Sequence, residues 1–456
     1  MSSRNNQLPL IKLFLFIFSI GIIKAQDTQY WTQTYGTSST LLGGIVVGSV
    51  SDLAATYYNP GNLALTNDPN FLFTAKVFEY TSTTVDPITS KNIDKFGSSS
   101  LKPSPSFVVA NLTSDWLGKN RIAFSFLTRQ SMDIGLKTRF DATNANSSIS
   151  DDFNFMEDLS DIWAGITWSL PIEKKVGIGI TQYICTRSYS SRHELNIKTS
   201  DSLNQVSAVS GITQYEYLDF RILWKAGIGF KLNSFKFGLT ITTPSINITG
   251  IGSTDINLSG TGLEYDSSGN HNDFLISNFQ DDLSSTFKSP LSIALGIYYD
   301  FGNFKLHLAT EYFNKVNKYN ILSPEPFQSQ TNDLTISNDL TAAYDAVLNY
   351  GLGMEYYLNP KFTIYTAFAT DYSAYTAGEE INSTISNWNI FHITAGAAFT
   401  IDKLQITSGL ATSFANDYVG FPHIRSATIN NREVDFEKQV AEVSQFKIKV
   451  ILGVTF

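Results

Sequence analysis

Hydrophobic and polar residues alternate along the chain in a series of short segments that begins near residue 70. The clearest is the last one, Gln445 to Phe456, where every second residue is apolar: Phe446, Ile448, Val450, Leu452, Val454 and Phe456. The residues between them are mostly lysine, glycine and threonine. Because successive side chains of a strand point to opposite faces, the pattern predicts a strand with one apolar and one polar face. Transmembrane barrels with lipid outside and a polar lumen have such strands.

Fourteen segments of this kind are separated by turn-forming residues, and each predicts a strand. They are 70–80, 104–111, 119–130, 160–170, 174–188, 214–230, 235–246, 288–300, 303–314, 347–358, 360–372, 389–400, 403–414 and 445–456. Six connections are a few residues long, and the other seven are polar and run from about 15 to over 40 residues. Short turns on one side and long loops on the other are typical of outer-membrane barrels. We therefore expect an all-β fold, a 14-stranded antiparallel transmembrane β-barrel over residues 70–456.

The first 25 residues have a different pattern. Arg4 and Lys12 precede an apolar run from Leu13 to Ile23, and Ala25 follows as a cleavage position. The run is shorter than the roughly 20 residues that a spanning helix needs. A charged start, a short apolar region and a small residue predict a signal peptide over residues 1–25.

Composition agrees with a protein that faces lipid. Aromatic residues make up 13% of the chain and charged residues only 16%, as expected for a barrel with aromatic girdles. The net charge of -9 argues against a nucleic-acid partner, because no basic stripe is present to meet phosphates. Cys185 is the only cysteine, so a disulfide framework and multi-cysteine metal sites are excluded. The five histidines lack metal-ligand spacing, and no Gly-x-Ser-x-Gly occurs, so we expect no metal, no cofactor and no catalytic residues.

Residues 26–69 do not alternate. Ser51 or Asp52 is a candidate cap for a short helix, and Asn59 should end that helix because it precedes a proline. Pro60 and Gly61 then predict a turn. A compact, glycine-rich segment ahead of a wide barrel suggests a plug in the lumen.

The stretch from Ser51 to Ala64, with Asn59, Pro60 and Gly61 at its centre, resembles the Asn-Pro-Ala segment in the N-terminal hatch of FadL-like outer-membrane transporters. Gly61 departs from the alanine usual in that family. The resemblance covers essentially the whole mature chain, and it implies passive uptake of long-chain fatty acids or aromatic hydrocarbons. In that family the ligand is captured at the outer loops and enters the lumen, and a hatch and a strand distortion then release it. The usual place of that distortion in the family is the third strand, here Lys119 to Gln130, but the sequence does not tell which strand of this chain is distorted.

Several charged residues fall on the polar faces of the expected strands. In plugged barrels such groups pair across the lumen and fix the plug, so we expect a lumen polar cluster of Asp219, Arg221, Lys225, His307, Glu311 and Glu355.

The expected partners are a hydrophobic small-molecule ligand, outer-membrane lipids and, during insertion, the barrel assembly machinery, with the protein itself monomeric. An outer-membrane enzyme is not expected. The alternative is a PorV-like barrel that serves protein secretion or assembly, in which the polar connections 247–287 and 415–444 would hold the exported protein.

Overall fold

The computed structural model describes residues 28–66, 71–87, 95–103, 107–112, 115–144, 147–201, 203, 205–263, 273–331, 334–376, 388–401, 404–421 and 439–455. The predicted signal peptide and Phe456 lie outside these residues. The strands are β1 (Phe71–Pro87), β2 (Phe96–Lys102), β3 (Phe107–Leu112), β4 (Arg121–Asn144), β5 (Ser147–Glu173), β6 (Val176–Asp201), β7 (Val206–Leu232), β8 (Phe235–Thr242), β9 (Ile246–Thr261), β10 (Phe274–Ser284), β11 (Ser292–Asp300), β12 (Phe304–Phe313), β13 (Val316–Leu322), β14 (Phe327–Gln328), β15 (Thr335–Ile336), β16 (Leu340–Tyr344), β17 (Val347–Asn359), β18 (Phe362–Asp371), β19 (Ile390–Ile401), β20 (Leu404–Phe421) and β21 (Gln439–Thr455).

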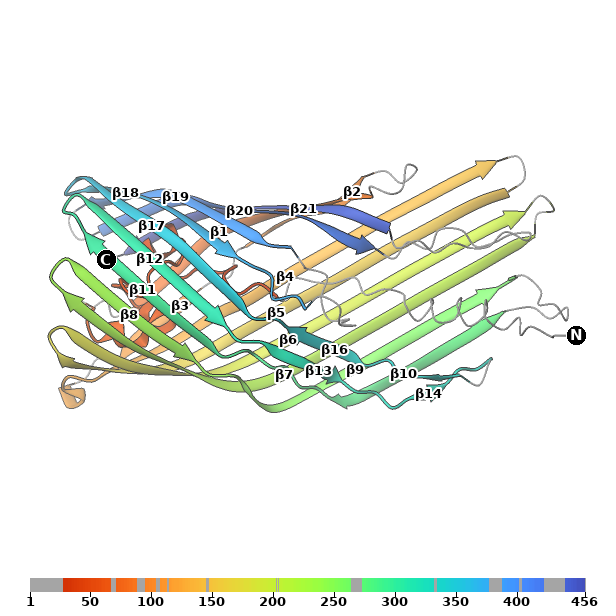
Figure 1. The fold of residues 1–456 in the computed structure, drawn as a ribbon, viewed down its shortest axis with the longest axis horizontal. Helices are drawn as coiled ribbons and strands as arrows, with labels where there is room; N and C mark the ends of the chain where they lie inside the picture. Colours follow the sequence, from red (N-terminus) through yellow and green to blue (C-terminus); the bar gives the residue numbers. More distant parts are fainter. Residues whose placement is uncertain are drawn as a thin grey trace, which may run out of the picture.

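Of the 17 strands in the main sheet, fourteen form a ring of antiparallel pairs, in the order β1-β3-β4-β5-β6-β7-β8-β11-β12-β17-β18-β19-β20-β21. The last strand returns to the first, with Ala75 opposite Leu452 and Pro87 opposite Ala441. These fourteen strands occupy the fourteen predicted segments, so the predicted fold class is confirmed. The elongated ring of tilted strands is visible in Figure 1.

The two faces of the strands are those that the alternation predicts. On β21, Phe446 and Leu452 are exposed, whereas Ile451 is fully buried inside the ring. On β12, Leu308 is exposed and His307 is buried. The exposed apolar side chains form a band on the outside, as in a barrel that faces lipid. Among the described residues no helix combines the length and the apolarity that a membrane crossing requires.

Several connections predicted as polar loops continue the strands instead. The four strands β4, β5, β6 and β7 are 24 to 27 residues long and project past the rest of the ring (Figure 1). Much of 247–287 forms β9 and β10, and residues 415–421 and 439–444 belong to β20 and β21. The loop interpretation of these stretches is wrong because a ladder is held by backbone groups, which pair regardless of polar side chains. Residues 422–438 lie outside the described part of the chain.

Residues 28–66, hereafter the N-terminal segment, lie within the ring against the inner faces of several strands (Figure 1, red). The segment contains the short helices α2 (Ser38–Leu41), α3 (Ala55–Tyr58) and α4 (Pro60–Leu63). Asp52 accepts a hydrogen bond from the Ala54 N–H (2.9 Å) just before α3.

The predicted turn at Pro60 and Gly61 is wrong in detail, because these residues open α4. Asn59 is extended, as expected before proline, with φ -160° and ψ 98°. Proline is well tolerated at the first helical position, where its missing N–H would have no partner inside the helix.

Candidate functional site

Asn59 joins the N-terminal segment to itself and to the barrel wall. The fully buried amide donates from Nδ2 to the Val47 carbonyl (2.9 Å) and to the Ile228 carbonyl on β7 (3.0 Å). Its Oδ1 accepts the Gly61 N–H at 3.0 Å and so caps α4. One side chain therefore caps the N-terminus of α4, joins two parts of the N-terminal segment and attaches both to the wall.

Gly61 sits where the segment touches the wall most closely. A Cβ at this position would lie 2.7 Å from the carbonyl oxygens of both Gly177 and Gly227, on β6 and β7. Real Cβ atoms do not approach backbone that closely, so alanine, the residue expected from the family pattern, would force the segment and the wall apart. The inward-facing glycines of these strands allow α4 to pack directly against the backbone of the wall.

His307 and Glu355 form a second attachment point. His307 Nδ1 lies 2.7 Å from the Ser49 hydroxyl of the N-terminal segment, and Nε2 lies 2.9 Å from Glu355 Oε1. Glu355 also accepts a hydrogen bond from Tyr357 and lies 3.7 Å from the Lys305 ammonium. The histidine thus links a hydroxyl of the N-terminal segment to a carboxylate on the wall. The partners of its two ring nitrogens fix the orientation of the imidazole.

Glu311 and Asp371 hold the beginning of the segment. Glu311 accepts hydrogen bonds from the Trp31 indole (2.8 Å) and the Ser292 hydroxyl (2.7 Å). Asp371 accepts the Tyr30 N–H at 2.8 Å. Carboxylates that accept such bonds make stronger contacts than neutral acceptors do. The segment is therefore attached to β12 and β18 as well as to β7.

A separate group of charges is buried in the wall formed by β5, β6 and β7. Asp161 contacts the guanidinium groups of Arg187, at 3.5 Å, and Arg221. Arg221 Nη1 also lies 3.5 Å from Asp219 Oδ1, and both arginines are fully buried. Two acids and two bases in one place keep the buried charge balanced, which a low-dielectric site requires.

These charges hold residues 285–291, hereafter the inner segment, which connect β10 to β11. The Phe287 N–H donates to Asp219 Oδ2 at 3.0 Å. The Phe287 ring lies 3.9 Å from the Arg187 guanidinium and 4.9 Å from that of Arg221, measured from ring centre to Cζ. Cation–π contacts of this kind are strongest where water is excluded. Asp219 and Arg221 therefore fix the inner segment, and not the N-terminal segment as expected.

The third barrel strand, β4, is one of the strands with an irregularity. Its pairing with β5 shifts register between Thr128 and Gln130. A bulge places two consecutive side chains on the same side of a sheet, and both Arg129 and Gln130 are buried inside the ring. The Arg129 guanidinium lies 5.7 Å from the Trp163 ring centre, and its Nη1 has no hydrogen-bond partner among the described residues.

A cavity lies between the N-terminal segment, the inner segment and the wall. The cavity is narrow, and part of the atom-free space around it is open solvent. It is lined by Tyr30, Tyr57, Arg129, Gln130, Asp161, Trp163, Leu223, Lys225, Thr242, Phe287, Lys288, Ser289, Pro290, Ser292, Glu311, Phe313 and Tyr344. Lys225 is buried with its ammonium 4.5 Å from the Tyr57 ring centre, and it has no salt-bridge partner among the described residues.

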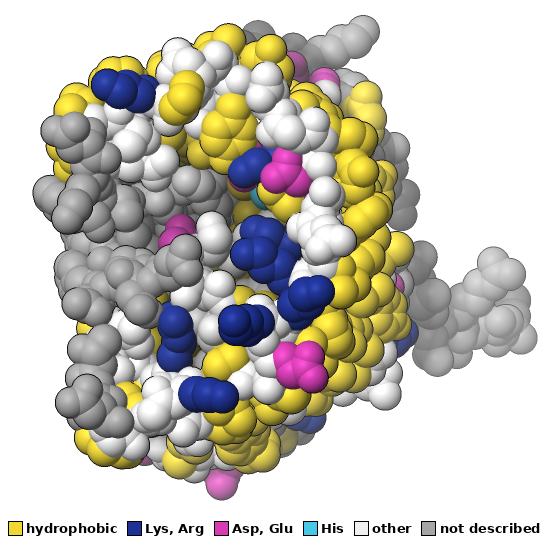
Figure 2. Space-filling model, turned by 90° about the vertical axis from the view of Figure 1, so that its left-hand side faces the viewer, with side chains coloured by type: hydrophobic (Ala, Val, Ile, Leu, Met, Phe, Trp, Pro, Cys, Tyr) yellow, Lys and Arg dark blue, Asp and Glu magenta, His cyan; other side chains and the backbone are white. Residues whose placement is uncertain are grey.

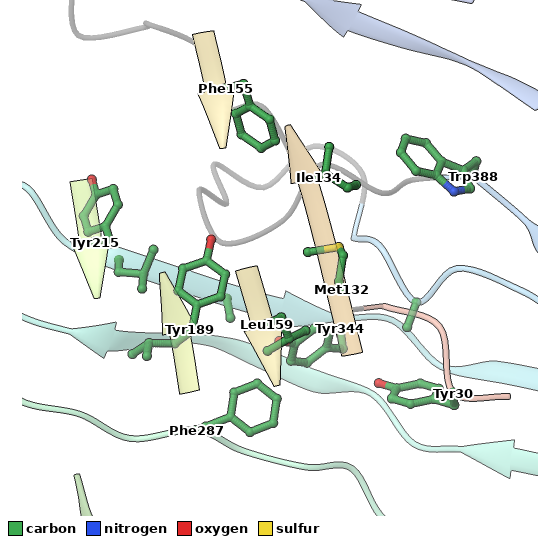
Figure 3. Packing of buried hydrophobic residues seen from close by; sticks show 14 of the residues in the cluster. Tyr30, Met132, Ile134, Phe155, Leu159, Tyr189, Tyr215, Phe287, Tyr344 and Trp388 are labelled. Carbon is green, nitrogen blue, oxygen red and sulfur yellow. The ribbon is translucent and has the colours of Figure 1, made fainter. Parts of the chain in front are cut away.

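An apolar cluster lies inside the ring next to the cavity. The apolar cluster, part of which is drawn in Figure 3, is formed by Tyr30, Val85, Met132, Ile134, Leu136, Phe155, Leu159, Tyr189, Tyr215, Tyr217, Phe287, Phe313, Ile321, Leu322, Leu340, Ala342, Tyr344, Val347, Ala374, Trp388, Ile390, Ala415, Ala441 and Val443. Tyr30 stacks on Phe313 with ring centres 4.1 Å apart. Four residues belong both to this cluster and to the cavity lining, so the cavity opens onto apolar surface.

In the part of the wall that the structure describes, strand pairing is interrupted between β2 and the part of β4 after Leu127, and this interruption is hereafter called the window. β3 pairs with β4 only as far as Leu127, and β2 pairs with β1. Among the described residues no pairing joins β2 to the part of β4 that follows Leu127. Across this window the Lys102 ammonium contacts the Asp133 carboxylate. Met132 and Ile134 of the apolar cluster line the window as well.

The structure therefore divides the expected lumen polar cluster into separate groups. His307 and Glu355 meet at Ser49, Asp219 and Arg221 meet at the inner segment, and Lys225 and Glu311 line the cavity. Sequence reasoning missed Arg129, Asp161, Arg187 and Phe287. The first three fall in predicted strands, but only the pairing of β4 to β7 shows that they converge.

The fold and these features define an antiparallel β-barrel with its N-terminal segment inside the ring and a buried apolar cluster next to a cavity. A comparison with solved structures identifies the fold as that of FadL-like channels. The chain is similar to the P. putida toluene transporter TodX, with 15% identity, 92% of this chain and 98% of that chain covered, and a TM-score of 0.60. A Pseudomonas aeruginosa FadL homologue is 12% identical, with 93% and 99% covered and a TM-score of 0.58.

The toluene transporter TbuX of Ralstonia pickettii has the same fold, with 12% identity, 92% of this chain and 98% of that chain covered, and a TM-score of 0.52. No family model and no curated protein sequence matches the chain. The three structures thus establish the architecture along nearly the whole chain.

Proposed function

We propose that this protein is a passive channel of the cell outer membrane that takes up hydrophobic small molecules. The ligand is captured at the outer loops, moves through the apolar cluster and reaches the cavity. The observation that carries the proposal is a cavity inside the ring whose lining shares Tyr30, Phe287, Phe313 and Tyr344 with the buried apolar cluster. Removing apolar surface from water provides the driving force for this entry.

The charges of the cavity favour a fatty acid over an aromatic hydrocarbon. Arg129 and Lys225 are buried cations that line the cavity without a salt-bridge partner among the described residues. A buried cation without an anion is costly, and a ligand carboxylate would relieve that cost. An alkyl chain would then lie along the apolar cluster. A neutral hydrocarbon would leave both cations without a salt-bridge partner among the described residues.

Release is proposed to be lateral, through the window between β2 and β4. Met132 and Ile134 line both the window and the apolar interior, so an alkyl chain can stay on apolar surface along this path. An exit through the other end of the ring would cross the N-terminal segment, which Asn59 and His307 attach to the wall. We propose that the segment acts as the hatch that closes this direct route.

Ligand binding to the purified protein tests the substrate class. We expect Arg129→Gln and Lys225→Met to weaken oleate binding by about 10- to 150-fold each, because a hydrogen bond to a charged group contributes about 1.5–3 kcal/mol. Binding of methyl oleate and toluene should stay within about twofold, since neither carries an anion. Lys198→Met, at an exposed position of β6, is the matched control.

Equal weakening of oleate and toluene would contradict the carboxylate site and leave general apolar uptake standing. Transport is tested separately, by uptake of the same three compounds in cells that lack the protein. Unchanged uptake of all three, with a protein partner co-purified in stoichiometric amount, would favour the secretion or assembly role.

A further inference from the structure

The six short turns lie together at one end of the ring, the left end in Figure 1, and they share an amphipathic composition. Each contains or directly adjoins a large apolar side chain that is about half exposed or more: Trp116 (75%), Ile172 (58%), Leu232 (50%), Phe301 (61%), Leu358 (53%) and Ile401 (47%). Such residues continue the outer apolar band to the very end of the barrel.

Lysines accompany these apolar residues. Five exposed ones lie in the same turns: Lys119, Lys174, Lys175, Lys231 and Lys361. None of the five has a salt-bridge partner among the described residues. Figure 2 looks onto this end and shows the basic side chains gathered around the hollow of the mouth.

The basic turn end contrasts with the chain as a whole, whose net charge is -9. In the described turn residues the exposed acid is Glu173, whereas acids are frequent on the extended parts of the strands at the opposite end, for example Asp141, Asp152 and Asp255. Charge is therefore separated along the barrel axis, with the positive end at the short turns. This separation makes the turn end attractive to anions although the protein is acidic.

We propose that the turn end binds anionic phospholipid headgroups of the leaflet around it. The apolar side chains enter the boundary between headgroups and acyl chains, and the neighbouring lysines extend their ammonium groups to the phosphates. A lipid surface fits better than a protein because the apolar residues occur in all six turns. A leaflet contacts the whole circumference of a barrel, whereas a docked protein would contact one sector.

The proposal rests on the membrane insertion that the proposed function assumes, and not on transport or on the identity of the ligand. The expected size of the preference for anionic lipid follows from the number of lysines near the headgroups. One lysine close to an anionic surface contributes a preference of about fivefold. Several lysines act together on the lipids next to the turns, and salt weakens their effect because these ammonium groups are exposed.

The test measures lipid selectivity of the full-length protein in nanodiscs that contain phosphatidylcholine and phosphatidylglycerol in equal amounts. Native mass spectrometry after mild extraction counts the lipids that remain bound. We expect phosphatidylglycerol to be retained at least about fivefold over phosphatidylcholine. The triple variant K174E/K175E/K231E should lose this preference, and so should the natural protein in 0.5 M salt.

The control variant K137E/K198E carries its changes on β4 and β6, in exposed positions of the extended parts, and should keep the preference. A boiled-against-unboiled gel shift of each variant verifies that the barrel is folded. Insertion without lipid preference, or equal loss in the control variant, would overturn the proposal. Failure to insert into nanodiscs of any composition would instead refute the membrane barrel itself, so the two failures are distinguishable.

Discussion

Replacing Asn59 by alanine should loosen the N-terminal segment while leaving the barrel intact. The side chain makes three hydrogen bonds, to the carbonyls of Val47 and Ile228 and from the N–H of Gly61. All three are lost in Asn59→Ala. The strand pairs of the ring do not involve this side chain, so the fourteen-stranded wall should form as before.

The magnitude follows from the number of bonds. Each intramolecular hydrogen bond contributes about 1 kcal/mol, so three contribute about 3 kcal/mol. The Val47 carbonyl keeps a partner, because the Asn62 side chain also donates to it at 3.2 Å, and this limits the loss. A change of about 3 kcal/mol raises the population of a detached segment by about 150-fold.

Single-channel conductance in planar bilayers measures this population, because a detached segment leaves an ion path through the ring. Hydrogen exchange of residues 45–65 should accelerate by a similar factor, while exchange in the strands stays unchanged. Asn303→Ala, at an exposed turn residue, is the control. Conductance and exchange that match the natural protein would refute the conclusion that Asn59 holds the segment in place.

Three further changes probe other parts of the molecule. Gly61→Ala should lower the temperature at which the unboiled gel form is lost, because its Cβ would meet the Gly177 carbonyl at 2.7 Å; an unchanged temperature would contradict this packing. Cross-linking cysteines placed at Lys102 and Asp133 across the window should slow uptake without weakening oleate binding, and unimpaired uptake would exclude this exit. Burial raises the pKa of Asp151, on the extended part of β5, to about 7. The folded state therefore keeps this proton at pH values where the unfolded chain has lost it, so the stability of the folded state falls as the pH rises from about 4 to 7. Hydrogen exchange measures this stability, and the Asp151→Asn variant should show no such fall. A fall that persists in the variant would refute the assignment to Asp151.

The fold could be predicted because the membrane strands alternate regularly between apolar and polar residues. Alternation fixed the faces of β12 and β21, and turn residues separated the hairpins. The lengths of β4 to β7 were not predicted, because their extended parts reverse the pattern of the membrane strands: apolar side chains such as Met132, Phe155 and Tyr217 are buried inside the ring. The many polar residues between them gave these stretches the composition of a loop.

The candidate site was harder to predict for a physical reason. In β4 the apolar residues Phe124, Phe126, Met132 and Ile134 all have even numbers, which places them on one face of a regular strand. The bulge at Arg129 reverses the phase, so Phe124 and Phe126 are exposed outside and Met132 and Ile134 are buried inside. A local backbone irregularity thus creates the inner apolar surface, and periodicity alone cannot reveal it.

The seam between β1 and β21 joins the two ends of the barrel chain. Such a distant pairing costs the most loop-closure entropy and forms late. The N-terminal segment precedes β1 in the chain, yet it lies inside the ring that this seam closes. Because the segment is joined directly to β1, one of the two strands of the seam, we expect it to be close to the growing barrel when the last strand pairs.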